Sequence, residues 1–214
     1  FGTKAETLYR LDGHLKKCTI PKFFYFTVKE WHDNPQKILE KLKLSFDDSM
    51  LIVRSSAANE DSSDTAMAGE DLSIANVHSS NEEEVIASVN DVIESYRKLE
   101  KIASSEDQVL VQEMTLDVSM SGVLFTKDMN SGAPYYVINY DDETGRTDTI
   151  SSGTGYSNRT LYIHREYGFT SLKSERFLSL IDAVKEIESF VSSDMLDIEF
   201  AIDNLSYEVN LLQV

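Results

Sequence analysis

The sequence is short of cysteine and of positive charge, and it lacks any long apolar run. Its one cysteine, Cys18, rules out an internal disulfide and favours a reducing, cytoplasmic location. No apolar stretch approaches the roughly 20 residues that span a bilayer. Only 20 Lys and Arg stand against 37 Asp and Glu, which gives a net charge of −17. Such a field repels nucleic acid and anionic membranes, so neither is expected as a partner.

The residues that are abundant suit a folded protein. Hydrophobic residues make up 41% of the 214 positions and aromatic residues 10%, which excludes a disordered chain. This length suits one large domain or two small lobes that share a cleft. In so acidic a chain, an anionic ligand must be held locally by a few cations or by a metal ion. Cys18 is expected to be a buried or inert thiol.

Hydrophobic periodicity predicts helices and strands. Helices are expected at residues 4–12, from Asn34-Pro35 onward, from Ser80 or Asn81 onward, and at 174–191. Strands are expected at 22–26, 49–54, 108–114, 121–126, 134–140, 147–151, 159–164, 197–202 and 207–213. The last two are expected to form a hairpin. Helices gather early and strands follow one another later, which favours an α+β fold with a mostly antiparallel sheet in the second half.

Two acidic residues on a predicted strand indicate a metal site. Asp197 and Glu199 lie two apart in "DIEFAI", so both carboxylates face the same side of the strand. Two like charges side by side are unfavourable unless something positive lies between them. Carboxylates in ones and twos, completed by phosphates and water, are typical of Mg²⁺ sites. Gln213, on the partner strand, would add an amide. The alternative is an exposed strand face without a ligand.

Two cations and a glycine are candidates for phosphate binding. Arg54 ends the apolar run "LIVR", just before an acidic segment that closes on Gly69. Its guanidinium suits the phosphates of a nucleoside triphosphate, although a lone arginine is more often a surface ion-pair partner. Lys4 is a second candidate of the same kind. Gly69 with Ser73 would form a flexible flap whose backbone N–H groups and hydroxyl approach phosphate oxygens.

Several motifs, taken together, resemble one family. The stretch "VRSSAANEDSSDTAMAG" (53–69) resembles the "VRSSA-x-x-ED-x-x-x-x-x-x-AG" pattern of the phosphoenolpyruvate synthase and pyruvate phosphate dikinase family, in its N-terminal ATP-grasp nucleotide-binding domain. The segments "FGTKAETL" (1–8), "VQEM" (111–114), "SGVLFTKDMNSG" (121–132) and "DIEFAI…LLQV" (197–214) resemble that family's opening Gly-x-Lys helix, interlobe hinge, hairpin and terminus. The motifs follow the family order across essentially the whole chain.

The resemblance implies an α+β, ATP-grasp-like fold with two lobes around a nucleotide cleft. The N-terminal lobe (1–110) would carry the phosphate-binding lysine, arginine and glycine loop, and the C-terminal lobe (111–214) the metal-binding strand. Lys4 and Arg54 would be the catalytic cations and would bind the phosphates of ATP, together with Gly69 and Ser73 of the glycine loop. Gln112, Glu113 and Met114 would bind adenine through backbone hydrogen bonds and apolar contact. Glu199 and Gln213 would also bind ATP. Mg²⁺ would be held by Asp197, Glu199 and Gln213.

In members of that family this domain passes the β-phosphoryl group of ATP to a histidine on a separate domain, leaving AMP and phosphate. The phosphohistidine then phosphorylates a small-molecule acceptor. None of the histidines here lies in the glycine-rich setting of that residue. The chain is therefore expected to be a fragment of a longer multidomain phosphotransferase, whose phosphohistidine and acceptor-binding domains are its partners. Its short connecting segments favour a glutamine-kinase-like or another small-molecule member over a pyruvate enzyme.

Two other functions stay open. An ATP-grasp ligase, which forms an acyl-phosphate, often places Glu-x-Asn on the last metal-binding strand, and "YEVN" supplies Glu208 and Asn210. Against it, alternation along a regular strand would put those two side chains on one side and Gln213 on the other. The net charge of −17 is the only feature that favours a non-catalytic acidic interaction domain.

Overall fold

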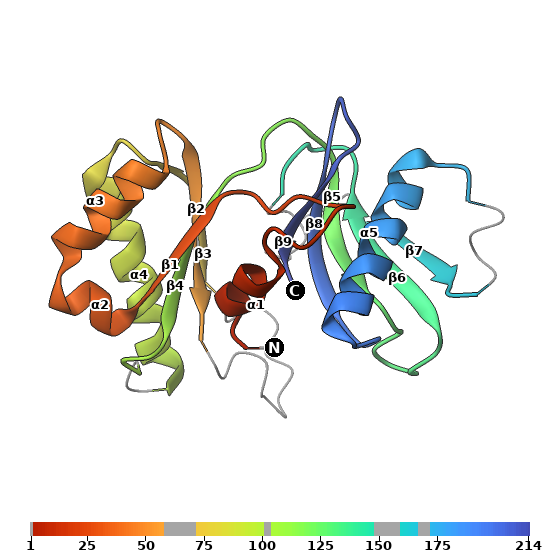
Figure 1. The fold of residues 1–214 in the computed structure, drawn as a ribbon, viewed down its shortest axis with the longest axis horizontal. Helices are drawn as coiled ribbons and strands as arrows, with labels where there is room; N and C mark the ends of the chain where they lie inside the picture. Colours follow the sequence, from red (N-terminus) through yellow and green to blue (C-terminus); the bar gives the residue numbers. More distant parts are fainter. Residues whose placement is uncertain (1, 58–71, 101–103, 148–158, 167–171) are drawn as a thin grey trace. The chain divides into compact units, whose positions relative to one another are not determined.

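The computed structural model describes residues 2–57, 72–100, 104–147, 159–166 and 172–214 (Figure 1). The chain divides into two compact units. The four-stranded unit comprises Gly2–Thr7 and Lys22–Met114, and the five-stranded unit comprises Leu8–Pro21 and Thr115–Val214. The division falls within helix α1 (Lys4–Leu11), whose first residues group with the four-stranded unit.

The four-stranded unit is an antiparallel sheet with helices against one face. Its strands run in the order β1 (Phe23–Thr27), β4 (Gln108–Glu113), β2 (Met50–Ser56) and β3 (Ser73–His78). Figure 1 shows α2 (Val28–Asp33), α3 (Pro35–Ser45) and α4 (Glu82–Glu100) on the same side of this sheet. Alternate strand residues, among them Leu51, Val53, Val109 and Val111, form one apolar core with residues of these helices. The side chains of the residues between them therefore point to the opposite face of the sheet, away from the helices.

Capping residues set where two of these helices begin. Asn34 accepts a hydrogen bond from the N–H of Lys37 and Pro35 opens α3, which confirms the helix predicted after Asn34-Pro35. Thr27 and Glu30 form a capping box at the start of α2, a helix that the sequence pattern did not predict. Strand β3 was not predicted either.

The five-stranded unit is antiparallel throughout, as predicted for the second half of the chain. Its strands run in the order β7 (Arg159–His164), β6 (Tyr135–Asp141), β5 (Val118–Phe125), β8 (Asp197–Asp203) and β9 (Val209–Gln213). The predicted strand at 147–151 lies almost entirely outside the described residues.

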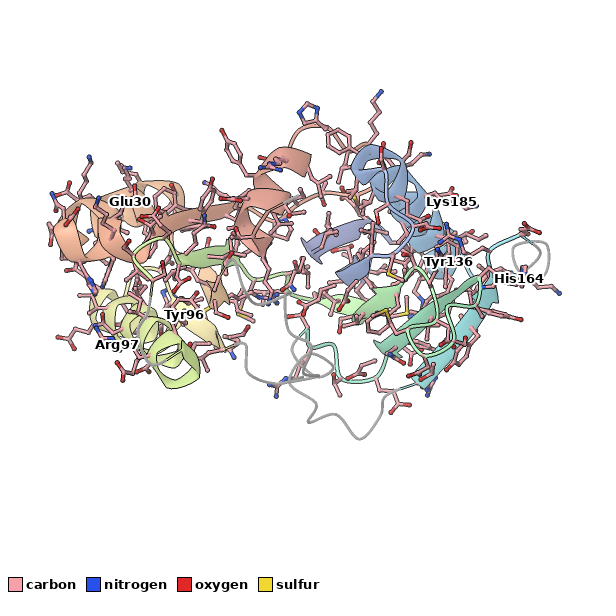
Figure 2. The ribbon with its side chains drawn as sticks, turned by 90° about the horizontal axis from the view of Figure 1, so that it is seen from below. Glu30, Tyr96, Arg97, Tyr136, His164 and Lys185 are labelled. Atoms are coloured by element: carbon pink, nitrogen blue, oxygen red, sulfur yellow. The ribbon has the colours of Figure 1, made fainter. Side chains whose placement is uncertain are left out.

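Helix α5 (Glu175–Val191) packs on one face of this sheet. The ring of Phe177 meets that of Tyr140 edge-on at 5.2 Å, and the Tyr136 hydroxyl, labelled in Figure 2, donates to a Glu188 carboxylate at 2.8 Å. Arg165 donates to the same carboxylate group at 2.6 Å. Burial, together with this hydrogen bond to Glu188, raises the pKa of Tyr136, so the phenol stays protonated.

Strand β5 approaches β6 so closely at Gly122 that a side chain is excluded. A Cβ at this position would lie 2.1 Å from the backbone oxygen of Asn139 and 2.9 Å from the Cα of Tyr140. Because both neighbours are backbone atoms, neither can rotate away. Glycine is therefore a steric requirement in the "SGV" segment of β5.

Cys18 is a buried, free thiol, as predicted. Burial, with a smaller contribution from the Glu186 carboxylate, raises the pKa of this thiol from 9.0 to about 12. Among the described residues, no helix has both the length and the apolar character needed to cross a membrane.

We expect native Cys18 to resist iodoacetamide at pH 8 and to react after unfolding in urea, because only the thiolate is the nucleophile.

Since the pKa of Cys18 in the folded chain lies above that of the unfolded chain, the contribution of this thiol to stability is complete below pH 9 and is lost as the pH rises toward 12. Urea unfolding at pH 7 and pH 10.5 measures this loss. The Cys18→Ala variant should lose less stability between the two pH values, and an equal loss would contradict the assignment.

Candidate functional site

The four-stranded sheet gathers several of the predicted ligand residues on the face opposite its helices. Arg54 lies opposite Leu110 on one side and Ser73 on the other, Ile52 lies opposite Gln112, and Ser56 lies opposite Gln108. Opposite residues of an antiparallel pair project from the same face. We call the surface defined by Arg54, Ser56, Ser73, Gln108 and Gln112 the Arg54 face.

Lys4 is brought to this face by the first turn of α1. The N–H of Ala5 donates to the hydroxyl of Ser56 at 3.0 Å, and Ser56 is two residues from Arg54 on the same strand face. Lys4 is 6% exposed and Arg54 4% exposed. Two nearly buried cations on one face of an acidic chain supply the local positive charge that an anionic ligand requires.

The end of β4 carries the three residues predicted to meet adenine. The N–H of Glu113 donates to Lys22 and that of Met114 to Met50, each at 2.8 Å, so both backbone donors are used within the unit. Gln112 is 1% exposed, and its Nε2 has no hydrogen-bond partner among the described residues. A buried donor without a partner costs free energy, so this amide fits a polar ligand group.

The predicted flap is only partly described. Gly69 lies outside the described residues, as does the whole segment 58–71. Ser73 is the first residue of β3, held opposite Arg54, and is therefore part of the sheet rather than of a flexible loop.

The five-stranded sheet places the predicted metal ligands on the face opposite α5. One row of opposite residues crosses all five strands: Thr160, Asn139, Val123, Glu199 and Gln213. In the next row Phe125 lies opposite Asp197. Asp197, Glu199 and Gln213 therefore share one surface, which we call the Glu199 face. The hairpin predicted for the last two strands is confirmed.

A bulge between β8 and β9 sets which residue meets Glu199. The pairs Phe200 with Leu211 and Ala201 with Asn210 follow one register, but the register shifts by one residue so that Glu199 pairs with Gln213. Leu212 is the extra residue of this bulge and packs with Val118 and Ala201. Asn210 and Gln213 therefore lie opposite residues of the same face. The expectation that they point to opposite sides was wrong, because it assumed a regular strand.

Asn139 joins the Glu199 face without having been predicted. Its Oδ1 accepts a hydrogen bond from the Thr160 hydroxyl at 2.8 Å, which orients the amide. In "YYVINYD" both alternating sets of residues contain apolar side chains, so periodicity alone does not tell which set faces the core. The register with Val123 supplies that information.

The donor set on the Glu199 face fits Mg²⁺. It offers two carboxylates and an amide oxygen, with Glu199 and Gln213 half-buried and Asp197 exposed. Within the described ranges, no group of three or more His, Cys, Asp and Glu residues could hold a metal ion. A Mg²⁺ ion held here would therefore need further oxygen ligands from phosphates and water, which is how proteins usually bind this ion with a nucleotide.

The sequence and the fold of this chain are similar to those of known proteins. The sequence profile described as "Pyruvate phosphate dikinase, AMP/ATP-binding domain" matches residues 28–140. No curated protein sequence matches the chain. Among solved structures, the dinucleotide-forming acetyl-coenzyme A synthetase 1 of Ca. Korarchaeum cryptofilum aligns with a TM-score of 0.54 at 10% identity, over 99% of this chain and 90% of that one. A Pyrococcus horikoshii protein aligns with a TM-score of 0.52 at 12% identity, over 91% of this chain and 82% of its own.

The D-alanine–D-alanine ligase of Helicobacter pylori aligns less closely, with a TM-score of 0.47 at 12% identity over 98% of this chain. The chain spans about half of that enzyme, 48% of its length. The two closer alignments show the fold, which is ATP-grasp-like and α+β, as the sequence predicted. Because the profile match covers more than half of the 214 residues, this chain belongs to the family of pyruvate phosphate dikinase AMP/ATP-binding domains.

Proposed function

We propose that this chain is the ATP-binding domain of a dikinase-type phosphotransferase. Mg·ATP would give its β-phosphoryl group to a ring nitrogen of a histidine on a separate domain of the same protein, and AMP and phosphate would leave. The phosphohistidine would then phosphorylate a small-molecule acceptor, such as the amide of glutamine or pyruvate. The observation that carries this proposal is the pairing of Glu199 with Gln213, beside Asp197, in a member of an ATP-binding family.

Each group of residues has a distinct part in nucleotide binding. Lys4 and Arg54 would neutralise triphosphate oxygens, with Ser73 and the Gly69 segment adding hydroxyl and backbone donors. The buried amide of Gln112 would donate to a ring nitrogen of adenine, with Glu113 and Met114 contributing carbonyl oxygens and apolar contact. Asp197, Glu199 and Gln213 would hold the metal ion. Bound Mg²⁺ would offset negative charge on the phosphates and orient them for transfer.

The ligase alternative is weakened by the surroundings of its two residues. The Oδ1 of Asn210 accepts a hydrogen bond from the Thr19 hydroxyl at 3.1 Å, so this oxygen already has a partner within the unit. Glu208 is exposed and precedes the first residue of β9. Gln213 lies directly opposite Glu199, and this favours the dikinase pattern of ligands over Glu-x-Asn.

Analysis of the products tests the proposal. We expect the full-length protein to convert Mg·ATP to AMP and phosphate, because both phosphoanhydride bonds are broken in a dikinase reaction. With ATP labelled at the β-phosphorus, the label should remain on the protein in an acid-labile, alkali-stable form typical of phosphohistidine. Label at the γ-phosphorus should appear in free phosphate.

Two results would contradict it. Release of ADP together with an acyl-phosphate would favour the ligase. An absence of any Mg-dependent nucleotide binding would favour the acidic interaction domain. Reactions with EDTA in place of Mg²⁺ are the control for metal-independent hydrolysis.

A further inference from the structure

The start of α1 is fastened to the sheet by buried polar side chains of β2 and β4. Gln108 is 7% exposed and Ser56 0% exposed, and the two lie opposite each other. The Oε1 of Gln108 accepts from the Thr3 hydroxyl at 2.6 Å, and its Nε2 donates to Glu6 at 3.0 Å. One amide therefore contacts the residue before α1 and a residue of its first turn.

The two contacted residues also cap the helix. The N–H of Glu6 donates to the Thr3 hydroxyl at 3.2 Å, and the N–H of Thr3 donates to the Glu6 carboxylate at 3.3 Å, which is a capping box. A helix of eight residues is marginal in isolation, so tertiary contacts decide where its first turn lies. Gln108 supplies those contacts to both members of the box.

Gln108 and Ser56 are themselves held by one hydroxyl group. Tyr96, labelled on α4 in Figure 2, donates to the backbone oxygen of Gln108 at 2.5 Å. It accepts from the N–H of Ser56 at 2.8 Å. The two anchoring residues are thus fixed to each other and to the helical layer of the four-stranded unit.

We propose that Gln108 is a positioning residue that fixes Lys4 on the Arg54 face for contact with nucleotide phosphate. Lys4 stands between Thr3, held by Gln108, and Ala5, held by Ser56. Ser56 is two residues from Arg54 on the same strand face, so the network sets the place of one phosphate-binding cation relative to the other. This inference rests on the proposed function.

Glutamine is the side chain that this place requires. Its amide offers an acceptor to Thr3 and a donor to Glu6 at the same time. Methionine keeps the size but leaves both partners without their hydrogen bonds. Glutamate keeps the acceptor, but its carboxylate would meet that of Glu6, and two like charges at this distance raise the pKa of the pair.

The experiment compares ATP with adenosine on the full-length protein. In Gln108→Met, Mg·ATP affinity measured by calorimetry should fall about tenfold, while adenosine affinity measured by ligand-observed NMR should change less than about twofold. A fold that is merely weakened would lower both. In a Lys4→Ala background the same substitution should have no further effect on Mg·ATP, because the positioned group is gone. Gln36→Met, an exposed glutamine in α3, is the matched control.

A second variant keeps the test independent of the folding of Gln108→Met. In Gln108→Glu, Mg·ATP affinity relative to wild type should be low at pH 8 and rise at pH 5.5, as the carboxyl pair takes up a proton. Unchanged Mg·ATP affinity, or equal losses with and without Lys4, would overturn the positioning role while leaving the proposed function intact. If wild-type protein failed to bind Mg·ATP, the proposed function would fail, and this inference with it.

Discussion

Glu199→Gln is expected to weaken Mg·ATP binding by about 100-fold and to change the binding of metal-free ATP little. The carboxylate lies on the Glu199 face directly opposite Gln213, and an amide supplies neither its charge nor its second oxygen. Even the loss of a side chain that only supports a metal ligand typically costs 10- to 100-fold in affinity, so the loss of a charged ligand belongs at the upper end. Calorimetric titration with ATP in Mg²⁺ and in EDTA measures both affinities.

The same hairpin provides a matched control. Glu208→Gln makes the same chemical change at an exposed position before β9, and it should alter Mg·ATP affinity less than about twofold. A comparable loss in Glu208→Gln would favour the ligase assignment of metal ligands. Equal losses with Mg²⁺ and with EDTA in Glu199→Gln would show that Glu199 does not bind the metal.

Gly122→Ala is expected to lower the free energy of unfolding by about 3 kcal/mol, at the upper end of the cost of overpacking. The added methyl group would lie 2.1 Å from the backbone oxygen of Asn139, so β5 and β6 must move apart. These two strands are neighbours in the sheet that carries Glu199. Urea unfolding of the 214-residue chain measures the loss.

Gly132→Ala separates this steric cost from the ordinary cost of replacing a glycine. Gly132 has a φ of +69° and no atom within 4 Å of an added Cβ, so only its left-handed backbone opposes alanine. The expected loss there is about 1 kcal/mol. Similar losses in the two variants would mean that β5 relaxes away from β6 at little cost.

Two helices were predicted because their sequences carry a cap or a sustained apolar period. The pair Asn34-Pro35 predicted α3, and the apolar residues at helical spacing from Phe177 to Ile187 predicted α5. Helix α2 was missed because its six residues are too few to establish a period. Strand β3 was missed because it contains a bulge, at which Asn76 adopts a positive φ of 62°, so its side chains do not alternate regularly.

One pair of candidate ligands was predicted from its spacing in the sequence alone. The two-residue spacing of Asp197 and Glu199 fixes their common face without knowledge of the fold. The roles of Gln108 and Asn139 could not be predicted from the sequence, because they depend on distant partners. Gln108 contacts Thr3, 105 residues away, and Asn139 contacts Thr160, 21 residues away. Register and burial, which settle such contacts, are properties of the folded sheet.

The bulge in the last hairpin also bears on how ligand spacing should be counted in this strand. Gln213 lies three positions after Asn210, and in a regular strand such an odd interval would place the two side chains on opposite faces. Because the bulge adds one residue to β9, residues an odd number of positions apart across the bulge lie on the same face of the sheet. A redesign of β9 guided by strict alternation would therefore give position 213 an apolar side chain, directly opposite Glu199.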